Sequence, residues 1–265
     1  MTHVNGTMRI ATFNVNSIRS RLDIVRDWIR EHDPFILALQ ETKVTDELFP
    51  ADSLEELGYH VYFRGQKAYN GVALLSRVPA RRVRYGFDDG GPPDESRLLC
   101  ADFRGFTVVN TYVPQGRNIE HPMYAYKVEW FHRLRAWFDR QFGKRRPILW
   151  LGDMNVAHEP IDVHNPDERE KHVCYHKDAR AAFAHCRDRG FVDTFRMHHP
   201  EPGHYTFFDY RNPTYIHEGK GWRLDYILAT PALARTCKAS RIDITPRLKP
   251  RPSDHAVVMA EFETA

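Results

Sequence analysis

The chain has 265 residues, 42% of them hydrophobic, which is enough for one domain with a large core or for two small domains. Its net charge of +3 is only mildly basic, so the charge by itself does not identify a nucleic-acid partner. The four cysteines form no Cys-x-x-Cys pair, which argues against a zinc ribbon or a disulfide scaffold and fits a reducing cytosol.

The sequence shows no charged-then-apolar leader and no apolar run long enough to span a membrane. We therefore expect a cytoplasmic protein, located at the nucleoid if the source is a prokaryote, with no membrane partner. Positive residues cluster over 77–84, 144–146 and 247–251. Such clusters are usually solvated surface.

In the first half of the chain, the pattern of apolar residues predicts several strands and one long helix. Residues 1–7 are expected to be a flexible tail, and residues 8–265 a single domain, because no change in composition marks a linker. Leu22, Val25 and Ile29 share one face of a helix over 21–31. Strands are expected over residues 8–13, 35–39, 59–63 and 71–76, the last two as a hairpin.

The second half repeats the mixture of hairpins and helices. Helices are predicted over 124–142 and 178–189 from apolar residues at helical spacing. Strands are predicted over 98–103, 106–112, 148–151, 223–229 and 256–262. Hairpins among the helices exclude a purely parallel sheet, so a layered α/β fold with mixed sheets is favoured.

The stretch from Pro147 to Asn155 carries the strongest chemical signal. Gly152 is expected to break the buried strand 148–151, and Asp153 and Asn155 follow it. An acid and an amide two residues apart on an extended backbone point the same way. One could act as a base or metal ligand while the other donates to an anion, although a capped turn uses the same residue types.

Other predicted strands also end in polar side chains, at Asn14, Glu41 and Tyr112, and the pair Asp254-His255 lies just before the last predicted strand. Asp225 lies inside an apolar run, where its carboxylate should be buried with a partner because an unpaired buried charge is costly. Each residue alone also fits a turn, a cap or the core. Together they favour a site, although spacing in the sequence cannot bring them into contact.

Several ordered segments extend this pattern along the chain. They are Thr12-Phe13-Asn14-Val15-Asn16, Leu39-Gln40-Glu41-Thr42-Lys43, Tyr69-Asn70-Gly71-Val72-Ala73, Tyr112-Val113-Pro114-Gln115-Gly116, Gly152-Asp153-Met154-Asn155-Val156-Ala157-His158, Gly221-Trp222-Arg223-Leu224-Asp225-Tyr226 and Ser253-Asp254-His255. They resemble the motifs of the exonuclease III / AP endonuclease family, within the endonuclease–exonuclease–phosphatase superfamily. The resemblance runs from residue 8 to the C-terminus.

The resemblance implies a four-layered α/β sandwich: two packed mixed β-sheets flanked by helices, with the site at one end. It also implies a monomeric Mg²⁺-dependent DNA repair nuclease, with Mn²⁺ as an alternative cofactor. The enzyme would act on double-stranded DNA with abasic or 3′-blocked sites. It would cut the phosphodiester 5′ to the abasic site, with 3′→5′ exonuclease and 3′-phosphodiesterase or phosphatase activity besides.

Roles for individual residues follow from the same resemblance. The implied metal ligands are Glu41, Asn14, Asp254 and Asp153. The implied catalytic residues are Asp153, which orients or deprotonates the attacking water, with Asn155, Tyr112, and His255 paired with Asp225. The implied substrate contacts are Phe207, Trp222, Leu224, Asn70 and Arg117, with the loop over 211–215 as a wedge. Phe207, Trp222 and Leu224 would form an apolar pocket for a flipped abasic sugar, although all three also suit a core.

Two segments depart from the family pattern. Residues 171–175 stand where a small glycine-containing turn is expected, and Asn16 stands where some members have an aspartate. Two other functions use the same fold: a phosphoesterase on a non-DNA substrate, and a nucleic-acid-binding regulator without hydrolysis. A regulator should lack the residue types of Glu41, Asp153 or His255, and all of these are present.

Overall fold

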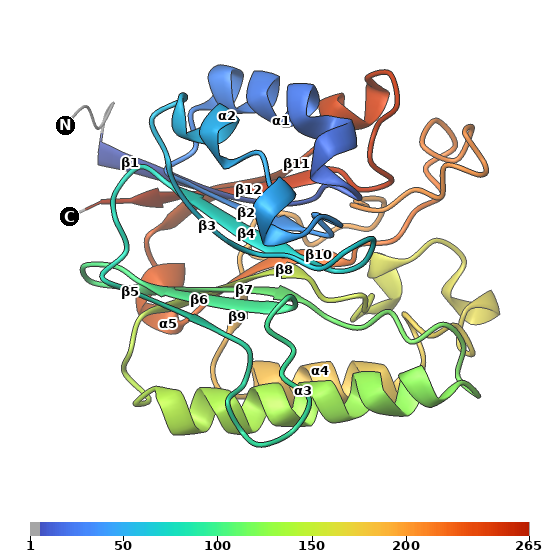
Figure 1. Ribbon diagram of the computed structural model, residues 1–265. Helices are drawn as coiled ribbons and strands as arrows, with labels where there is room; N and C mark the ends of the chain where they lie inside the picture. The colour runs from blue at the N-terminus through green and yellow to red at the C-terminus, as the bar shows by residue number, and fades with distance from the viewer. Residues whose placement is uncertain (1–5, 265) are drawn as a thin grey trace.

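The structure is a computed structural model that describes residues 6–264. Two six-stranded sheets pack face to face, and helices cover the outer face of each (Figure 1). Parallel and antiparallel pairs occur in both sheets, so the predicted four-layered sandwich of mixed sheets is confirmed. Residues 1–5 of the predicted tail lie outside the described residues, while Thr7 already belongs to the first strand.

The first sheet has the order β11-β12-β1-β2-β4-β3. Its strands are β1 (Thr7–Asn14), β2 (Ile36–Gln40), β3 (His60–Arg64), β4 (Val72–Ser76), β11 (Cys237–Asp243) and β12 (Val257–Glu263). The helices α1 (Ile18–His32) and α2 (Ala51–Glu55) cover its outer face (Figure 1). The parallel neighbours β1 and β2 are joined through α1, so both strands end at the same edge.

The second sheet has the order β5-β6-β7-β8-β10-β9. Its strands are β5 (Arg82–Tyr85), β6 (Leu98–Asp102), β7 (Thr107–Tyr112), β8 (Ile148–Asp153), β9 (Val192–Asp193) and β10 (Asp225–Ala229). The helices α3 (Pro122–Gln141) and α4 (Lys177–Arg187) cover its outer face, and the short α5 (Pro231–Ala234) follows β10. The crossover from β7 through α3 to the parallel β8 repeats the β1–α1–β2 arrangement.

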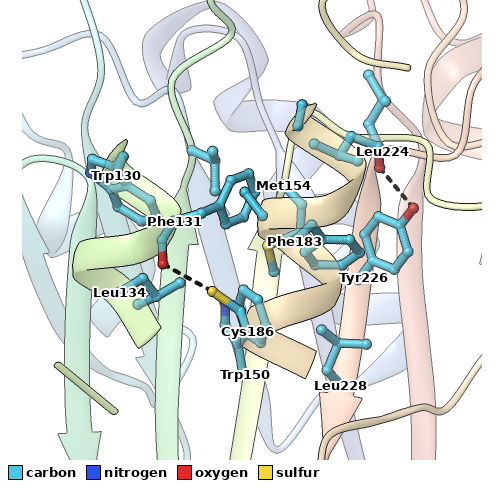
Figure 2. Packing of buried hydrophobic residues seen from close by; sticks show 14 of the residues in the cluster. Trp130, Phe131, Leu134, Trp150, Met154, Phe183, Cys186, Leu224, Tyr226 and Leu228 are labelled. Atoms are coloured by element: carbon cyan, nitrogen blue, oxygen red, sulfur yellow. Dashed lines mark hydrogen bonds between the residues drawn. The ribbon is translucent and has the colours of Figure 1, made fainter. Parts of the chain in front are cut away.

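The side chains of β8 point alternately to two buried faces, which explains why this sequence forms a strand in the middle of the sandwich. Ile148 and Trp150 face α3 and α4, whereas Leu149 and Leu151 face the other sheet. A strand covered on both faces needs apolar residues at consecutive positions, which is why this run contains no polar side chain. Beneath the helices, Trp150 packs near Phe183, and the Cys186 thiol donates to the carbonyl of Phe131 (Figure 2).

A buried polar bridge fixes the two sheets against each other. The Gln40 side chain on β2 donates to Thr12 Oγ1 (2.9 Å) and across the interface to Asn110 Oδ1 on β7 (2.7 Å). Asn110 in turn donates to the carbonyls of Leu39 and Ala73. Because an unpaired amide would be costly here, these bonds favour one alignment of the sheets. That alignment brings the ends of β1, β2 and β8 together.

The structure corrects several predicted elements. Gly152 does not break its strand, since β8 continues through it to Asp153. The strand predicted from residue 223 begins only at Asp225. Strands β5, β9 and β11 and helices α2 and α5 were not predicted, because they are short or carry mostly polar residues. Within residues 6–264, no helix is long and apolar enough to cross a membrane.

Candidate active site

Asn14, at the end of β1, joins two carboxylates that come from different sheets. Its amide nitrogen donates to Glu41 Oε1 and to Asp153 Oδ2, both at 2.9 Å. Its oxygen accepts from the backbone N–H of Asn16. In this arrangement Asn14 holds the two carboxylates close together and presents its nitrogen to them. Its implied role as a metal ligand stays a prediction.

Glu41 follows β2 in a left-handed conformation, with φ of +51°. This turn directs its side chain toward Asn14, while Lys43 Nζ lies 2.7 Å from the other carboxylate oxygen. Burial alone would raise the pKa of Glu41, but Lys43 and the Asn14 amide outweigh it and lower the pKa below its ordinary value. Glu41 is therefore an ionised oxygen donor at neutral pH.

Asp153 is the last residue of β8 and is almost fully buried. The preceding Gly152 has φ of +129°, and a Cβ there would lie 2.0 Å from the carbonyl oxygen of Thr111. Only glycine therefore fits between β7 and the end of β8. Burial, helped by the carboxylates of Asp225 and Glu41, raises the pKa of Asp153 to about 7 against the attraction of His255.

Asn155 reaches Asp153 by a turn, not by the extended backbone expected from the sequence. Its φ is +51°, and its backbone N–H donates to Asp153 Oδ1 at 2.8 Å. Its side-chain nitrogen donates to the carbonyl of Val113 (2.9 Å) and to Asp153 Oδ2 (3.2 Å). The predicted pairing of acid and amide is thus present, with the local backbone direction corrected.

His255 and Asp225 form a buried pair beside Asp153. His255 Nδ1 donates to Asp225 Oδ2 at 2.8 Å, and His255 Nε2 lies 3.9 Å from Asp153 Oδ2. Burial by itself would lower the pKa of His255, but the carboxylates of Asp225 and Asp153 raise it to about 10. The prediction that Asp225 is buried and partnered is confirmed.

We expect Asp225→Asn to move the titration of His255 from about 10 toward its ordinary value of roughly 6.5. The ion pair stabilises the fold fully below the unfolded pKa and loses this contribution as the pH rises through about 10. NMR titration of the imidazole in both proteins measures the shift. An unchanged midpoint for the His255 titration in Asp225→Asn would mean that Asp225 does not stabilise the protonated imidazole.

Tyr112, at the end of β7, is buried beside the same carboxylates. Burial first, and then the charges of Glu41 and Asp153, raise the pKa of its phenol well above the ordinary value. The hydroxyl therefore stays protonated and can donate. Asp254 lies across the site, where its Oδ1 accepts from the Asn16 side chain at 3.0 Å. Asn16, which stands where some family members have an aspartate, therefore donates a hydrogen bond to Asp254 and supplies no further carboxylate to the site.

Five of these residues line a cavity of about 450 Å³: Glu41, Tyr112, Asn155, Asp254 and His255. Asn14, Asp153 and Asp225 are not among its lining residues and are buried against those that are. Phe207, Trp222 and Leu224 line the same cavity. Phe207 forms bridges with Trp222 and His255, which places the aromatic wall directly against the polar cluster. The three apolar residues predicted to form a pocket therefore do meet the catalytic candidates in space.

The departing segment 171–175 also contributes to the cavity. His172 packs over Trp222 with ring centroids 4.4 Å apart, and Cys174 lines the cavity below. Burial, with the nearby charges of Lys127 and Arg169, lowers the pKa of His172 to about 4, so the ring is neutral at pH 7. The segment therefore adds a neutral imidazole and a thiol to the wall of the cavity.

Two predicted substrate contacts are not among the residues that line this cavity. Arg117 is exposed, and its guanidinium lies 3.5 Å from the ring of His121. The side-chain nitrogen of Asn70 donates to Gln66 Oε1, and the backbone carbonyl of Asn70 accepts from the backbone N–H of Lys43. Both stay predictions for contacts outside the cavity.

Besides the protonated His255, the cationic side chains at the cavity are Arg169, Arg211 and Lys220. The three basic clusters of the sequence do not line it. Arg84 and Arg146, from two of these clusters, are instead paired with Asp102. The interpretation of the clusters as solvated surface is wrong for Arg247, which is buried and donates to the carbonyl of Phe208.

Sequence reasoning missed Lys127 on α3. The structure shows that its side chain is fully buried. Its Nζ donates to the carbonyls of Gln115 (3.2 Å), Asn155 (2.7 Å) and Val173 (2.8 Å). One ammonium thereby ties together the three loops around the cavity. A lysine four residues before Phe131, on the apolar face of the predicted helix, was the signal that could have revealed it.

Sequence reasoning also missed the ion network behind the cavity. Arg223 binds Asp162 and Asp193, and Arg196 binds Asp162 from the other side. The backbone N–H of Arg223 also donates to the carbonyl of Asp162. This network fixes the segment that carries Trp222 and Leu224.

The cluster fits a hard divalent cation. Glu41, Asp153 and His255 each offer an atom within 4.8 Å of the others. His255 is a poor ligand here because Asp225 keeps its ring protonated, which leaves no free lone pair. The available donors are then carboxylate oxygens held together by Asn14, and oxygen ligands suit Mg²⁺ or Mn²⁺.

Comparison with known proteins places this geometry among nucleases. The profile of the Endonuclease/Exonuclease/phosphatase family matches residues 11–255. Exodeoxyribonuclease III from Haemophilus influenzae is 34% identical over 97% of this chain and 100% of its own length. An AP endonuclease from Archaeoglobus fulgidus superposes with a TM-score of 0.95 at 49% identity, covering 97% of this chain and 100% of that chain. NExo, a 3′ phosphatase from Neisseria bound to a product DNA hairpin, gives a TM-score of 0.91 at 37% identity, covering 96% and 99%.

Proposed function

The chain belongs to the Endonuclease/Exonuclease/phosphatase family, and we propose that it hydrolyses DNA on the 5′ side of abasic sites with Mg²⁺ as its cofactor. Its relatives include an exodeoxyribonuclease III, an AP endonuclease and a 3′ phosphatase. The chain is accordingly a DNA repair nuclease with endonuclease and exonuclease activity. We further propose that it acts as a monomer, since one chain supplies every residue of the cluster and cavity.

One observation carries the proposal for the abasic site. Glu41 and His255, which lie beside the buried Asn14 and Asp153, line a cavity that also has an aromatic and aliphatic wall. A phosphate at the cluster would place the adjoining sugar against Phe207, Trp222 and Leu224. Flipping a sugar into such a cavity costs least where no base is stacked, which favours a damaged site.

Glu41 and Asp153 would hold the cation, with Asp254 beside them. When bound, Mg²⁺ polarises the phosphate and neutralises the charge that develops during hydrolysis. Asn14 contributes by keeping the two carboxylates at hydrogen-bond distance of one amide. Two like charges held this close favour the binding of a cation over an empty site.

The remaining residues of the cluster act on the water and the phosphate. Asp153 orients the attacking water and accepts its proton, while two bonds from Asn155 fix the direction of the carboxylate. His255, held cationic by Asp225, donates to a phosphate oxygen. Tyr112 keeps its proton at neutral pH and donates to the phosphate or the leaving oxygen.

A labelled duplex with one stable abasic analogue tests the proposed function. We expect a single cut 5′ to the lesion with Mg²⁺, the same cut at a different rate with Mn²⁺, and none with EDTA. An intact duplex and a duplex with a 3′-phosphate measure the exonuclease and phosphatase activities separately. A ladder from the 3′ end of both duplexes, without the internal cut, would contradict the abasic-site preference. Absence of any cleavage by a metal-loaded, folded protein would favour the regulator or the non-DNA phosphoesterase.

Salt should weaken DNA binding in proportion to the number of phosphates that the cavity cations neutralise. With Arg169, Arg211 and Lys220 each contacting one phosphate, the affinity should fall roughly 40-fold between about 50 and 200 mM salt. Lys220→Ala should reduce the slope of log affinity against log salt by about 1. Lys238 on β11 pairs with Glu263 away from the cavity, so Lys238→Ala is the matched control. Equal slopes for the two variants would argue against a phosphate contact by Lys220.

A further inference from the structure

A second group of metal-binding residue types lies apart from the cavity, on the segment His199-Pro200-Glu201-Pro202-Gly203-His204. Glu201 Oε1 is 2.8 Å from His204 Nε2 and 3.4 Å from His199 Nδ1. The donor atoms of all three residues lie within 4.8 Å of one another. None of the three residues lines the cavity.

These separations suit a small divalent ion. In a tetrahedral zinc site, bonds of roughly 2.0–2.1 Å place neighbouring donor atoms about 3.3 Å apart. The three donors therefore need only small adjustments to surround one ion. Two imidazoles and one carboxylate suit zinc better than magnesium, which prefers oxygen ligands alone.

The other nitrogen of His199 provides an independent indication. His199 Nε2 lies 2.7 Å from the carbonyl oxygen of Ser240 on β11. A carbonyl can only accept, so Nε2 carries a proton, and Nδ1, which faces Glu201, is the nitrogen left to bind a metal ion. In metal sites, a histidine usually binds the ion through one ring nitrogen and donates a hydrogen bond from the other to a carbonyl or carboxylate.

The ligand segment is also held rigid before any ion binds. Both imidazoles pack on Phe195, with His199 stacked at 4.5 Å between ring centroids. Arg196 donates to the carbonyls of His199 and Glu201 from the inner side. Pro200 and Pro202 restrict the backbone further. Less conformational freedom is then lost on binding, which favours affinity.

We propose that His199, Glu201 and His204 form a zinc site that fastens the loop after β9 to β11. These two strands are the outermost strands of opposite sheets. The ion would strengthen their contact at an edge where Ser240 and His199 already meet. Glu201 is about half exposed, so the ion can enter from solvent and water can complete its coordination. The site is structural and does not depend on the nuclease activity.

The test is titration of metal-free full-length protein with Zn²⁺ in excess Mg²⁺, followed by calorimetry and by the absorption of Co²⁺ as a spectroscopic substitute. Wild type should bind one Zn²⁺ that Asp153→Asn retains. Glu201→Gln and His204→Gln should bind it on the order of 100-fold more weakly, the upper range for loss of even an outer-shell partner. His217→Gln, an exposed histidine outside the group, is the matched control.

Thermal unfolding gives a second readout that is independent of catalysis. Zn²⁺ at ~100-fold above its Kd should raise the Tm of wild type by about 5–10 °C and leave that of His204→Gln nearly unchanged. Without zinc the two proteins should have similar Tm values, because the pair of His204 and Glu201 is partly exposed and contributes little to stability. Equal zinc affinity in wild type and His204→Gln would overturn the proposal. Loss of the tight zinc in Asp153→Asn would do so too, since it would assign that ion to the catalytic cluster.

Discussion

Asp153→Asn is expected to lower the rate of cleavage at an abasic site by roughly 10²–10⁴-fold, the range for loss of a general base. The substitution keeps the shape of the side chain at the end of β8 but removes the negative charge that would accept the proton of the attacking water. It also removes one of the two carboxylates that Asn14 holds together. Single-turnover cleavage with saturating Mg²⁺ separates this effect on chemistry from weaker metal binding.

The same variant should fold about as stably as wild type in metal-free buffer, because two effects oppose each other. Burial raises the pKa of Asp153 above its unfolded value, so its ionisation opposes folding above a pH of roughly 4. Asparagine carries no charge and avoids this cost, but its amide nitrogen cannot accept the hydrogen bonds that Asn14 and Asn155 donate to the carboxylate, so its Tm in EDTA should stay close to that of wild type. Asp188→Asn, an exposed acid after α4, is the control for the substitution. An Asp153→Asn enzyme within tenfold of the wild-type rate would rule out Asp153 as the base.

Arg223→Met is expected to lower the free energy of unfolding by about 3–5 kcal/mol, the usual cost of removing one partner from a buried ion network. The Arg223 side chain is only 1% exposed. Its Nε lies 2.8 Å from Asp162 Oδ1, and its Nη2 lies 2.8 Å from Asp193 Oδ2. Methionine fills similar space but leaves both carboxylates without this cation. Urea denaturation at neutral pH measures the loss.

The pH dependence of stability distinguishes the ion network from simple packing. Burial would raise the pKa of Asp162, but Arg223 and Arg196 outweigh it and lower the pKa to about 2. The network therefore stabilises the fold above a pH of roughly 4, and this stability is lost as the pH falls through about 2. The difference in unfolding free energy between wild type and Arg223→Met should therefore be largest above a pH of roughly 4 and shrink as the pH falls toward 2, whereas a packing defect would leave it unchanged.

Arg30→Met is the matched control for this prediction. Arg30 pairs with Asp27 on the exposed face of α1, where such a pair contributes at most about 1 kcal/mol. The control should unfold in urea and in acid almost as wild type does. If Arg223→Met unfolds like Arg30→Met, the buried network does not stabilise the segment that carries Trp222 and Leu224.

Local signals determined most of the secondary structure. The alternating contacts of Ile148 and Leu149 require a continuous apolar run, and that run was visible in the sequence. The helices α1, α3 and α4 were visible because apolar side chains recur at helical spacing. β11 was missed because it lies at the edge of its sheet, where polar residues are tolerated and no apolar pattern arises.

The identity of the chemical groups was also readable from the sequence. Asn14, Glu41, Asp153 and His255 were predicted from polar side chains at strand ends and from the family motifs that contain them. Their contacts cannot be predicted from local sequence, however, because the Asn14–Asp153 hydrogen bond joins residues that are 139 positions apart in the chain. Long-range contacts of this kind form only when the two sheets pack, because neither sheet alone carries both partners.

The sequence by itself therefore determined most of the strands, the three long helices, the family and the residue types of the site. Tertiary structure alone decided that Lys127 ties three loops together, that Arg223 joins two buried acids, and that His199 meets Ser240. The physical reason is the same in each case. Helix and strand formation depend on near neighbours and their periodicity, whereas a buried charge or a ligand group acquires its role from partners that only the packed fold supplies.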